Sequence, residues 1–244
     1  MINKILLQSI VSKYFLGGMI ETVKWSIQDK KLVINFMSPL GDMLGKVEHD
    51  NFPLPDSKLT IFNTSQLNKL IAVVQGEILL EITSHKNTAI KLNISDLNFN
   101  VSYALADPQL VREVAEVDEP SEYEIEIILD QEQISNLIKS KNAVGDDNML
   151  IIESSIDLNG NNVLLFTFGE NTEHSNKITY SIRTESGNNI KLPFPSDTFK
   201  EILSANKDMV EGKILLSEEG LMKLEFVNEK QTKVEYFLVR KSDF

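Results

Sequence analysis

The side chains that most often carry catalytic chemistry are few in this sequence, and their spacing forms no recognisable site. The three histidines, His49, His85 and His174, stand far apart, and none pairs with another at the spacing of metal ligands. Polar residues surround His85 and His174, so we interpret the histidines as solvated surface residues. The chain has no cysteine, which excludes disulfides, thiolate metal ligands and a thiolate nucleophile.

Carboxylates are abundant, but nothing in their spacing singles out a catalytic pair. Asp146-Asp147 could belong to a metal site, although the neighbouring Gly145 and Asn148 favour a solvated turn. The sequence contains no P-loop, no glycine-rich dinucleotide-binding motif and no Gly-x-Ser-x-Gly motif. We therefore predict a protein without enzymatic activity, metal or cofactor. An enzyme that uses two converging acids is the weakest alternative.

The composition is ordinary for a globular protein, apart from its charge. Of the 244 residues, 42% are hydrophobic and 25% are charged, and no apolar run approaches the roughly 20 residues of a membrane helix. Polar residues interrupt the apolar N-terminus and no small-residue cleavage site follows it, so we expect a cytoplasmic protein without a membrane partner. The net charge of −12, taken in bulk, argues against nucleic-acid binding.

Four apolar blocks occur twice in the same order. The block that begins at Phe62 returns 132 positions later at Phe194, and three further blocks follow each copy at nearly the same offset. Their first and second copies are Ile78–Leu80 and Ile214–Leu216, Ile90–Ile94 and Met222–Phe226, and Val101–Leu105 and Val234–Leu238. A period of this length indicates two duplicated domains, which we place at 1–106 and 123–244. The residues between them, 107–122, carry two prolines and many acids and have the composition of a solvated connector.

Periodicity predicts the same order of elements in both domains. Apolar residues recur at helical spacing in four ranges, which are 3–15, 64–75, 131–144 and 196–207. Short runs of alternating apolar and polar residues, separated by tight turns, fill the rest of each domain and indicate antiparallel strands. The two halves of a domain also look alike. We predict an α+β fold in which a β-α-β-β-β module is used four times, with two helices on one face of each domain.

Positive charge is concentrated in the four predicted helices. They hold seven lysines and three acids, which leaves a net charge of −16 on the rest of the chain. Several of these lysines fall opposite the apolar stripe and could meet a polyanion if the helices share one surface. Exposed helix faces that simply favour lysine explain the pattern equally well. The candidates are Lys4, Lys13, Lys69, Lys139, Lys141, Lys200 and Lys207.

This organisation resembles the DNA sliding clamps of the PCNA type. It is most similar to the clamps of T4-like phages, which share the subunit length and a similar ending, here Ser242-Asp243-Phe244. The resemblance covers nearly the whole chain and lies in spaced apolar blocks, such as Ile34–Val47, Leu59–Leu70 and the pair Leu224–Phe226 and Val234–Val239. It implies a closed ring of three two-domain subunits, whose helical lysines loosely face the phosphates of enclosed duplex DNA. The outer sheets would not have to face DNA phosphates and could therefore be acidic.

The resemblance also implies two protein-binding surfaces. Subunits would pair head to tail through the strands 98–105 and 178–185, with interface residues Asn98, Asn100, Ser102, Leu105, Ile178, Tyr180, Ile182 and Thr184. Partner peptides would enter an apolar pocket beneath the connector. Its wall would consist of Met37, Leu40, Met43, Leu44, Val114, Val117, Leu221, Phe237 and Val239, each of which could instead be plain core.

The sequence therefore predicts a replication processivity factor. By resemblance, a homotrimeric clamp would encircle double-stranded DNA without sequence preference and tether the replicative DNA polymerase. An ATP-dependent clamp loader would open it, and a phage-encoded clamp would act in the host cytoplasm. The alternative is a duplicated β-rich protein-interaction or virion module that does not bind DNA and is indifferent to charge reversal at the helical lysines.

Overall fold

The computed structural model describes residues 1–86, 88–111, 114, 117–169, 176–209, 211–228 and 231–241. The chain clusters into two compact units, the first formed by Met1–Glu116 with Asn228–Val234 and the second by Val117–Val227 with Glu235–Phe244. Within the described residues, no helix is both long enough and apolar enough to cross a membrane.

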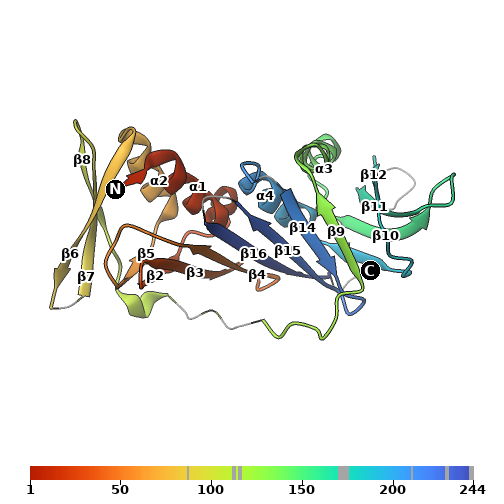
Figure 1. Ribbon diagram of the computed structural model, residues 1–244, viewed down its shortest axis with the longest axis horizontal. Helices are drawn as coiled ribbons and strands as arrows, with labels where there is room; N and C mark the ends of the chain where they lie inside the picture. Colours follow the sequence, from red (N-terminus) through yellow and green to blue (C-terminus); the bar gives the residue numbers. More distant parts are fainter. Residues whose placement is uncertain are drawn as a thin grey trace. The chain divides into compact units, whose positions relative to one another are not determined.

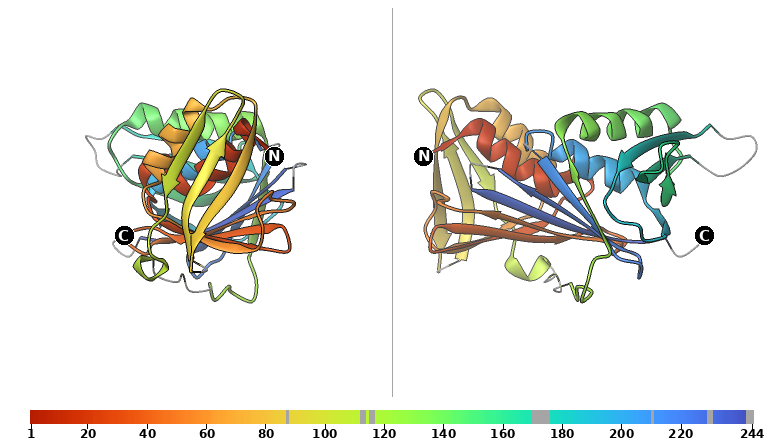
Figure 2. Two further views of the ribbon diagram at one scale, coloured as in Figure 1. Left: turned by 90° about the vertical axis from the view of Figure 1, so that its left-hand side faces the viewer. Right: turned by 45° about the vertical axis from the view of Figure 1, so that its right-hand side comes forward.

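The described part of the first unit contains two α-helices that cover antiparallel sheets (Figure 1). The helices α1 (Lys4–Phe15) and α2 (Thr64–Val73) pack against each other, and they also contact β4 and β8 respectively. One sheet has the strand order β5 (Ser57–Ile61), β2 (Val23–Gln28), β3 (Lys31–Met37) and β4 (Met43–His49). The other has the order β1 (Ile2–Asn3), β6 (Glu77–His85), β7 (Thr88–Ser95) and β8 (Asn100–Ala104), of which the last three are seen side by side in Figure 2.

The second unit has the same organisation. Its helices α3 (Gln131–Val144) and α4 (Ser196–Ala205) again pack against each other. One sheet has the order β12 (Ile178–Arg183), β11 (Asn162–Phe168), β10 (Leu150–Ile156) and β13 (Lys191–Phe194). The other has the order β16 (Thr232–Val239), β15 (Leu221–Val227), β14 (Glu211–Leu216) and β9 (Ile125–Leu129), where β16 belongs to this unit from Glu235 onward.

The predicted α+β class and the fourfold use of a β-α-β-β-β module are confirmed. Each module is one strand, one helix and three strands, beginning at β1, β5, β9 and β13. Sequence analysis missed β1 and β13 because they span only two and four residues, and β13 contains Pro193 at a sheet end, where a missing N–H is tolerated. The strand predicted from Asn98 begins at Asn100, because the Asp96 carboxylate accepts the N–H groups of Asn98 and Phe99 and holds a turn there.

The helices begin at side-chain caps. Asp130 and Gln133 form a reciprocal capping box at α3, directly before the predicted start of that helix at residue 131. At α2 the cap is Asn63, whose side chain accepts the N–H of Gln66 at 2.7 Å.

The histidines differ from the predicted surface role in one case. His49 is buried at the end of β4, where its Nδ1 lies 2.8 Å from Thr232 Oγ1. Burial holds the pKa of His49 below its usual range, so the ring stays neutral at pH 7. His85 is exposed as expected, and His174 lies outside the described residues.

A glycine opposite a buried aromatic ring sets the packing of one sheet in each unit. Gly45 faces Phe36 across β3 and β4, and a Cβ at Gly45 would lie 2.2 Å from the Phe36 ring. Gly212 faces Phe226 in the same way, with a distance of 2.5 Å. Both rings are buried, so neither has free space into which to retreat. These glycines are therefore required by the rings that cover them.

Replacing Gly45 with alanine should destabilise the fold by roughly 1–3 kcal/mol, the usual cost of overpacking a core. Gly187→Ala is the matched control, because its new Cβ would come no nearer than 3.7 Å to a neighbour. Urea unfolding followed by circular dichroism measures both. Equal stability of the two variants would show that Phe36 moves aside freely.

Candidate nucleic-acid and partner surfaces

Three of the seven candidate lysines present free ammonium groups. Lys69 on α2, Lys139 on α3 and Lys207 just after α4 are exposed. None of them forms an ion pair with any residue that the structure describes. Of the seven candidates, they are the ones whose charge stays available at the surface.

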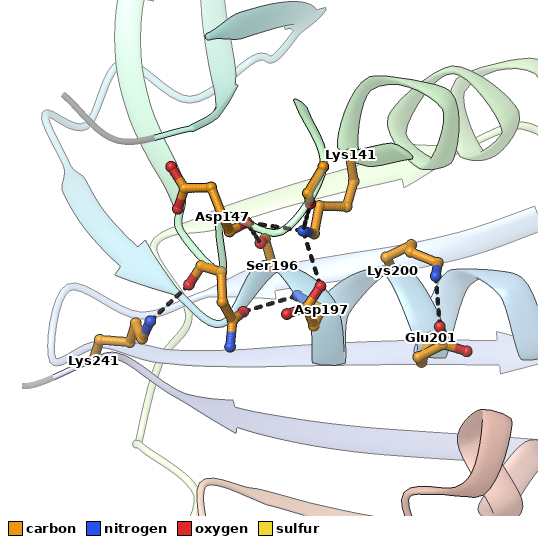
Figure 3. Close-up of polar contacts among 9 residues, drawn as sticks. Lys141, Asp147, Ser196, Asp197, Lys200, Glu201 and Lys241 are labelled. Carbon is orange, nitrogen blue, oxygen red and sulfur yellow. Dashed lines mark hydrogen bonds and ion pairs between the residues drawn. The ribbon is translucent and has the colours of Figure 1, made fainter. Parts of the chain in front are cut away.

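Two further lysines are half-buried and already engaged. Lys4 donates to the carbonyl of Ala72 at 2.8 Å, near the end of α2. Lys200 lies 2.7 Å from Glu201, its neighbour on α4 (Figure 3). Lys200 therefore contributes little net positive charge to its helix face, whereas Lys4 uses its ammonium group for a backbone carbonyl and lies near enough to Asp96 to help lower the pKa of that carboxyl.

The outward orientation predicted for Lys13 is wrong. Its side chain is fully buried. α1 packs against α2 and against β4, and the buried residues of α1 include Lys13 as well as Ile10 and Tyr14. A single helical stripe does not reveal that a second element covers the other side.

The DNA-facing role predicted for Lys141 is also contradicted, because only 2% of this residue is exposed. Its Nζ donates to the carbonyls of Gly145 and Asp147 at 2.6 and 2.8 Å and lies 2.9 Å from Asp197 Oδ1 (Figure 3). The Ser196 hydroxyl donates to the same Asp147 carbonyl. Lys141 thus joins the C-terminal end of α3 to the first turn of α4. The Lys141 cation complements the negative end of the α3 dipole, and the Asp197 carboxylate complements the positive end of the α4 dipole.

Asp146-Asp147 forms part of this loop. The Asp147 backbone carbonyl is occupied by Lys141 and Ser196, as described above. No three His, Asp or Glu side chains converge as a metal site anywhere in the described ranges.

The two strands predicted to pair between subunits both end their sheets. β8 is the last strand of its order and β12 the first of its own, so one backbone edge of each lacks a strand partner in the described residues. Asn98 precedes β8 in the turn and Leu105 follows it, half-buried. In β12, Ile182 is buried, Ile178 and Tyr180 are half-buried, and Thr184 lies just beyond the strand and donates its N–H to Asn162.

The first-unit part of the predicted pocket wall is only partly accessible. Met37 and Leu40 are exposed and Leu44 is half-buried, as a binding surface requires. Met43 is fully buried, so its assignment to the wall is wrong. Alternation along β4 turns Met43 into the core and Leu44 to the opposite face of the sheet.

In the connector, Val114 and Val117 are half-buried, and residues 112, 113, 115 and 116 lie outside the described residues. The predicted wall residues of the second unit are Leu221, which is half-buried, Val239, which is 49% exposed, and Phe237, which is 7% exposed.

A lysine that sequence analysis overlooked covers Phe237. The Lys223 ammonium lies 5.2 Å from the centroid of the Phe237 ring, a cation–π distance. It also contacts Glu119, Glu225 and Glu235 at 3.0–3.3 Å. Burial alone would lower the pKa of Lys223, but its hydrogen bonds to Glu225 and Glu119 raise it above the usual range.

Glu119 belongs to the connector, so Lys223 ties the end of the connector to the sheet of the second unit. Tyr123 extends the tie by donating to Glu119 Oε2 at 3.2 Å. Burial and the negative charge of Glu119 raise the pKa of Tyr123, so its hydroxyl remains a donor at pH 7. The alternation of Lys223 with two strand glutamates was visible in the sequence, but the partner in the connector was not.

The fold has counterparts among solved structures. The chain is similar to the PCNA of A. fulgidus, solved with the C-terminal region of FEN-1 bound, at 15% identity and a TM-score of 0.75, over 100% of this chain and 98% of that one. It is similar to the proliferating cellular nuclear antigen of Entamoeba histolytica at 17% identity and a TM-score of 0.76, over 98% of this chain and 96% of that one. Comparison of the sequence with protein-family models and with curated proteins gives no match. These likenesses establish the two-domain PCNA-like clamp fold. The C-terminal Ser242-Asp243-Phe244 lies outside the described residues.

The two lysines of α3 should behave differently when truncated. Lys141→Ala removes a charged donor from two carbonyls, which should cost roughly 1–3 kcal/mol of unfolding free energy. Lys139→Ala, two positions away and exposed, should leave stability unchanged within about 0.5 kcal/mol. Urea unfolding of both variants checks this, and equal effects would contradict a structural role for Lys141.

Proposed function

We propose that this protein is a DNA sliding clamp, a closed ring of three copies that encircles duplex DNA and tethers a DNA polymerase. The observation that carries the proposal is the likeness to two PCNA structures over at least 98% of the chain, rather than over one domain. A clamp acts by enclosing its ligand and needs no catalytic residue. An ATP-dependent clamp loader would open the ring.

The free helical lysines suit a loose hold on DNA. Each copy offers Lys69, Lys139 and Lys207, while Lys200 is neutralised by Glu201 and Lys13 and Lys141 are buried. Each phosphate neutralised by a protein cation adds to affinity and to its salt dependence. A small number of dispersed contacts keeps the electrostatic attraction weak, so the ring can move along the duplex while its closure prevents escape.

The free edges of β8 and β12 suit pairing between copies. The modules that contain them are equivalent, because β6-β7-β8 and β10-β11-β12 have the same order beside α2 and α3. Two equivalent modules placed edge to edge with their helices on one side are related by a two-fold rotation. The facing strands must then be antiparallel. Such pairing would also satisfy the backbone groups of two edge strands.

Side-chain alternation favours one pairing register. In β8, Tyr103 and the following Leu105 point to the helix side, and in β12 Ile178, Tyr180 and Ile182 do so. A slip by one residue would place these apolar side chains against the polar face. Beside β8 lies a recess of about 500 Å³, lined by Phe62, Leu70, Tyr103 and Leu105 among others. It is suited to receive Ile178 and Tyr180 of the next copy.

Pairing of β8 with β12 is heterologous, so it generates a ring only if successive copies close by rotation. With two domains in each copy, three copies form a ring of six domains. The partner-peptide surface would lie on the accessible apolar residues beside the connector, namely Met37, Leu40, Leu44, Val114, Val117, Leu221 and Val239, together with Phe237, which is buried beneath Lys223. Lys223 would have to leave the Phe237 ring, or share it, when a peptide binds.

The first test is the mass in solution by light scattering across a dilution series. We expect about three times the 27.6 kDa of one chain, falling to the monomer only at low concentration. Ile178→Asp should dissociate the trimer, because it places a charge in the apolar recess. Ile156→Asp is the control, at an exposed position outside the β8–β12 edge. A wild-type monomer at high concentration would overturn the ring.

The second test is retention on circular DNA after loading. Reversing Lys69, Lys139 and Lys207 to glutamate should reduce loading and salt-sensitive retention while leaving the trimer intact. The control reverses the exposed lysines Lys30, Lys86 and Lys91, which leaves the same net charge on the chain. Equal behaviour of both triple variants would favour the interaction module that does not bind DNA.

A further inference from the structure

The helix-free face of the β5-β2-β3-β4 sheet is basic, contrary to the expectation that the outer sheets are acidic. Alternation turns Trp25, Ile34 and Leu59 into the core and their neighbours to the other side. That side, here called the basic platform, carries the charged residues Lys24, Lys31, Lys46, Lys58 and Glu48. Four cations and one acid gather there on a chain whose net charge is −12.

The corresponding sheet face of the second unit is balanced internally. Lys213 pairs with Glu126 at 2.8 Å, and Lys223 has three carboxylates around it. One of the three is Glu119 of the connector. The two units thus share a fold but differ in how the cations of this face are neutralised.

On the basic platform only half of the cations are neutralised. Lys31 and Lys46 share Glu48, at 2.8 and 2.6 Å. Lys24 and Lys58 pair with no acid among the described residues. The nearby Asp107 carboxylate accepts the N–H of Gln109 and caps a short turn. Two like charges are therefore left on one face of the sheet without an acidic partner among the described residues.

The register of the sheet fixes the spacing of these two lysines. Lys24 lies opposite Thr60, and Ser26 lies opposite Lys58, so Lys24 and Lys58 are diagonal neighbours on one face. Diagonal neighbours in antiparallel strands have Cα atoms about 7–8 Å apart. Carboxylates at positions i and i+2 of an extended peptide are about 6.6 Å apart and point to the same side. The two spacings match.

A hollow of about 410 Å³ opens between these lysines and the start of the connector. Ser26, Asn35 and Thr60 supply polar groups to its lining, and Val33, Pro108 and Val114 supply apolar ones. The mixture suits a peptide, whose carboxylates need the lysines and whose intervening side chain needs an apolar surface. A bare inorganic anion would leave the apolar part of the hollow uncovered.

We propose that the basic platform binds an acidic segment of a partner protein, in extended conformation, with two acidic residues separated by one apolar residue. The two carboxylates bind Lys24 and Lys58 on the sheet, and the apolar residue between them points the other way and covers Pro108 and Val114 of the connector. This site is separate from the apolar peptide surface proposed above and does not require the ring to close. It gives an acidic chain a place where an acidic partner is attracted rather than repelled.

The test is fluorescence anisotropy at low ionic strength with a labelled Ser-Asp-Val-Asp-Ser peptide. We expect saturable binding that Lys24→Met with Lys58→Met weakens by about tenfold or more, because charged hydrogen bonds are lost. Lys30→Met with Lys86→Met is the control for charge alone and should bind as the wild type does. A Ser-Asn-Val-Asn-Ser peptide should not bind. All four lysines lie on the surface, so circular dichroism should show every variant folded.

Several results would overturn the proposal. Equal losses of peptide affinity in the two double variants would show that the attraction depends on net charge alone. Equal competition by inorganic phosphate and by unlabelled peptide would indicate a simple anion site. Binding that appears only after Glu113→Gln and Glu116→Gln would show that acids of the connector itself occupy the platform.

Discussion

The structure depends on an exchange of strands between its modules. In the first unit β1 pairs with β6 of the next module, and β5 of that module pairs back with β2. In the second unit β9 pairs with β14 and β13 with β10. Each module therefore completes a sheet of the other, and neither has its full set of backbone hydrogen bonds alone. The helices of both modules are thereby held on the same side of their unit.

This exchange also leaves particular edges open. The last strand of the second module, β8, and the last strand of the third, β12, are not covered by a borrowed strand in the described residues. An open, flat edge is a liability in a monomer unless another chain covers it. The side chains also favour a covering chain. An apolar recess lies beside β8, and Ile178 and Tyr180 of β12 are half-buried. Assembly of several copies would thus pair the backbone edges and cover the apolar side chains that a single folded chain leaves open.

Local ion pairs and hydrogen bonds, rather than the type of secondary structure, decide which lysine charges remain available. Helical lysines such as Lys141 are consumed as structural donors, while the lysines of the basic platform lie on a sheet. A count of charges per element, positive for helices and negative for the rest, therefore misplaces part of the positive charge. What matters to a polyanion or an acidic peptide is an ammonium group that pairs with no acid among the described residues, as in Lys69, Lys139 and Lys207 on or next to helices and in Lys24 and Lys58 on the basic platform.

The sequence by itself determined the elements, since helical spacing, alternation and caps such as Asp130 are local properties of neighbouring residues. It also determined the duplication, because equivalent modules need the same apolar positions. Only the tertiary structure decided which polar residues are covered. Lys13, Lys141 and His49 are all buried, and a one-dimensional pattern shows one face of a helix or strand but not what packs on the other. Strand register likewise brings Lys24 and Lys58 together, and the path of the connector brings Glu119 to Lys223.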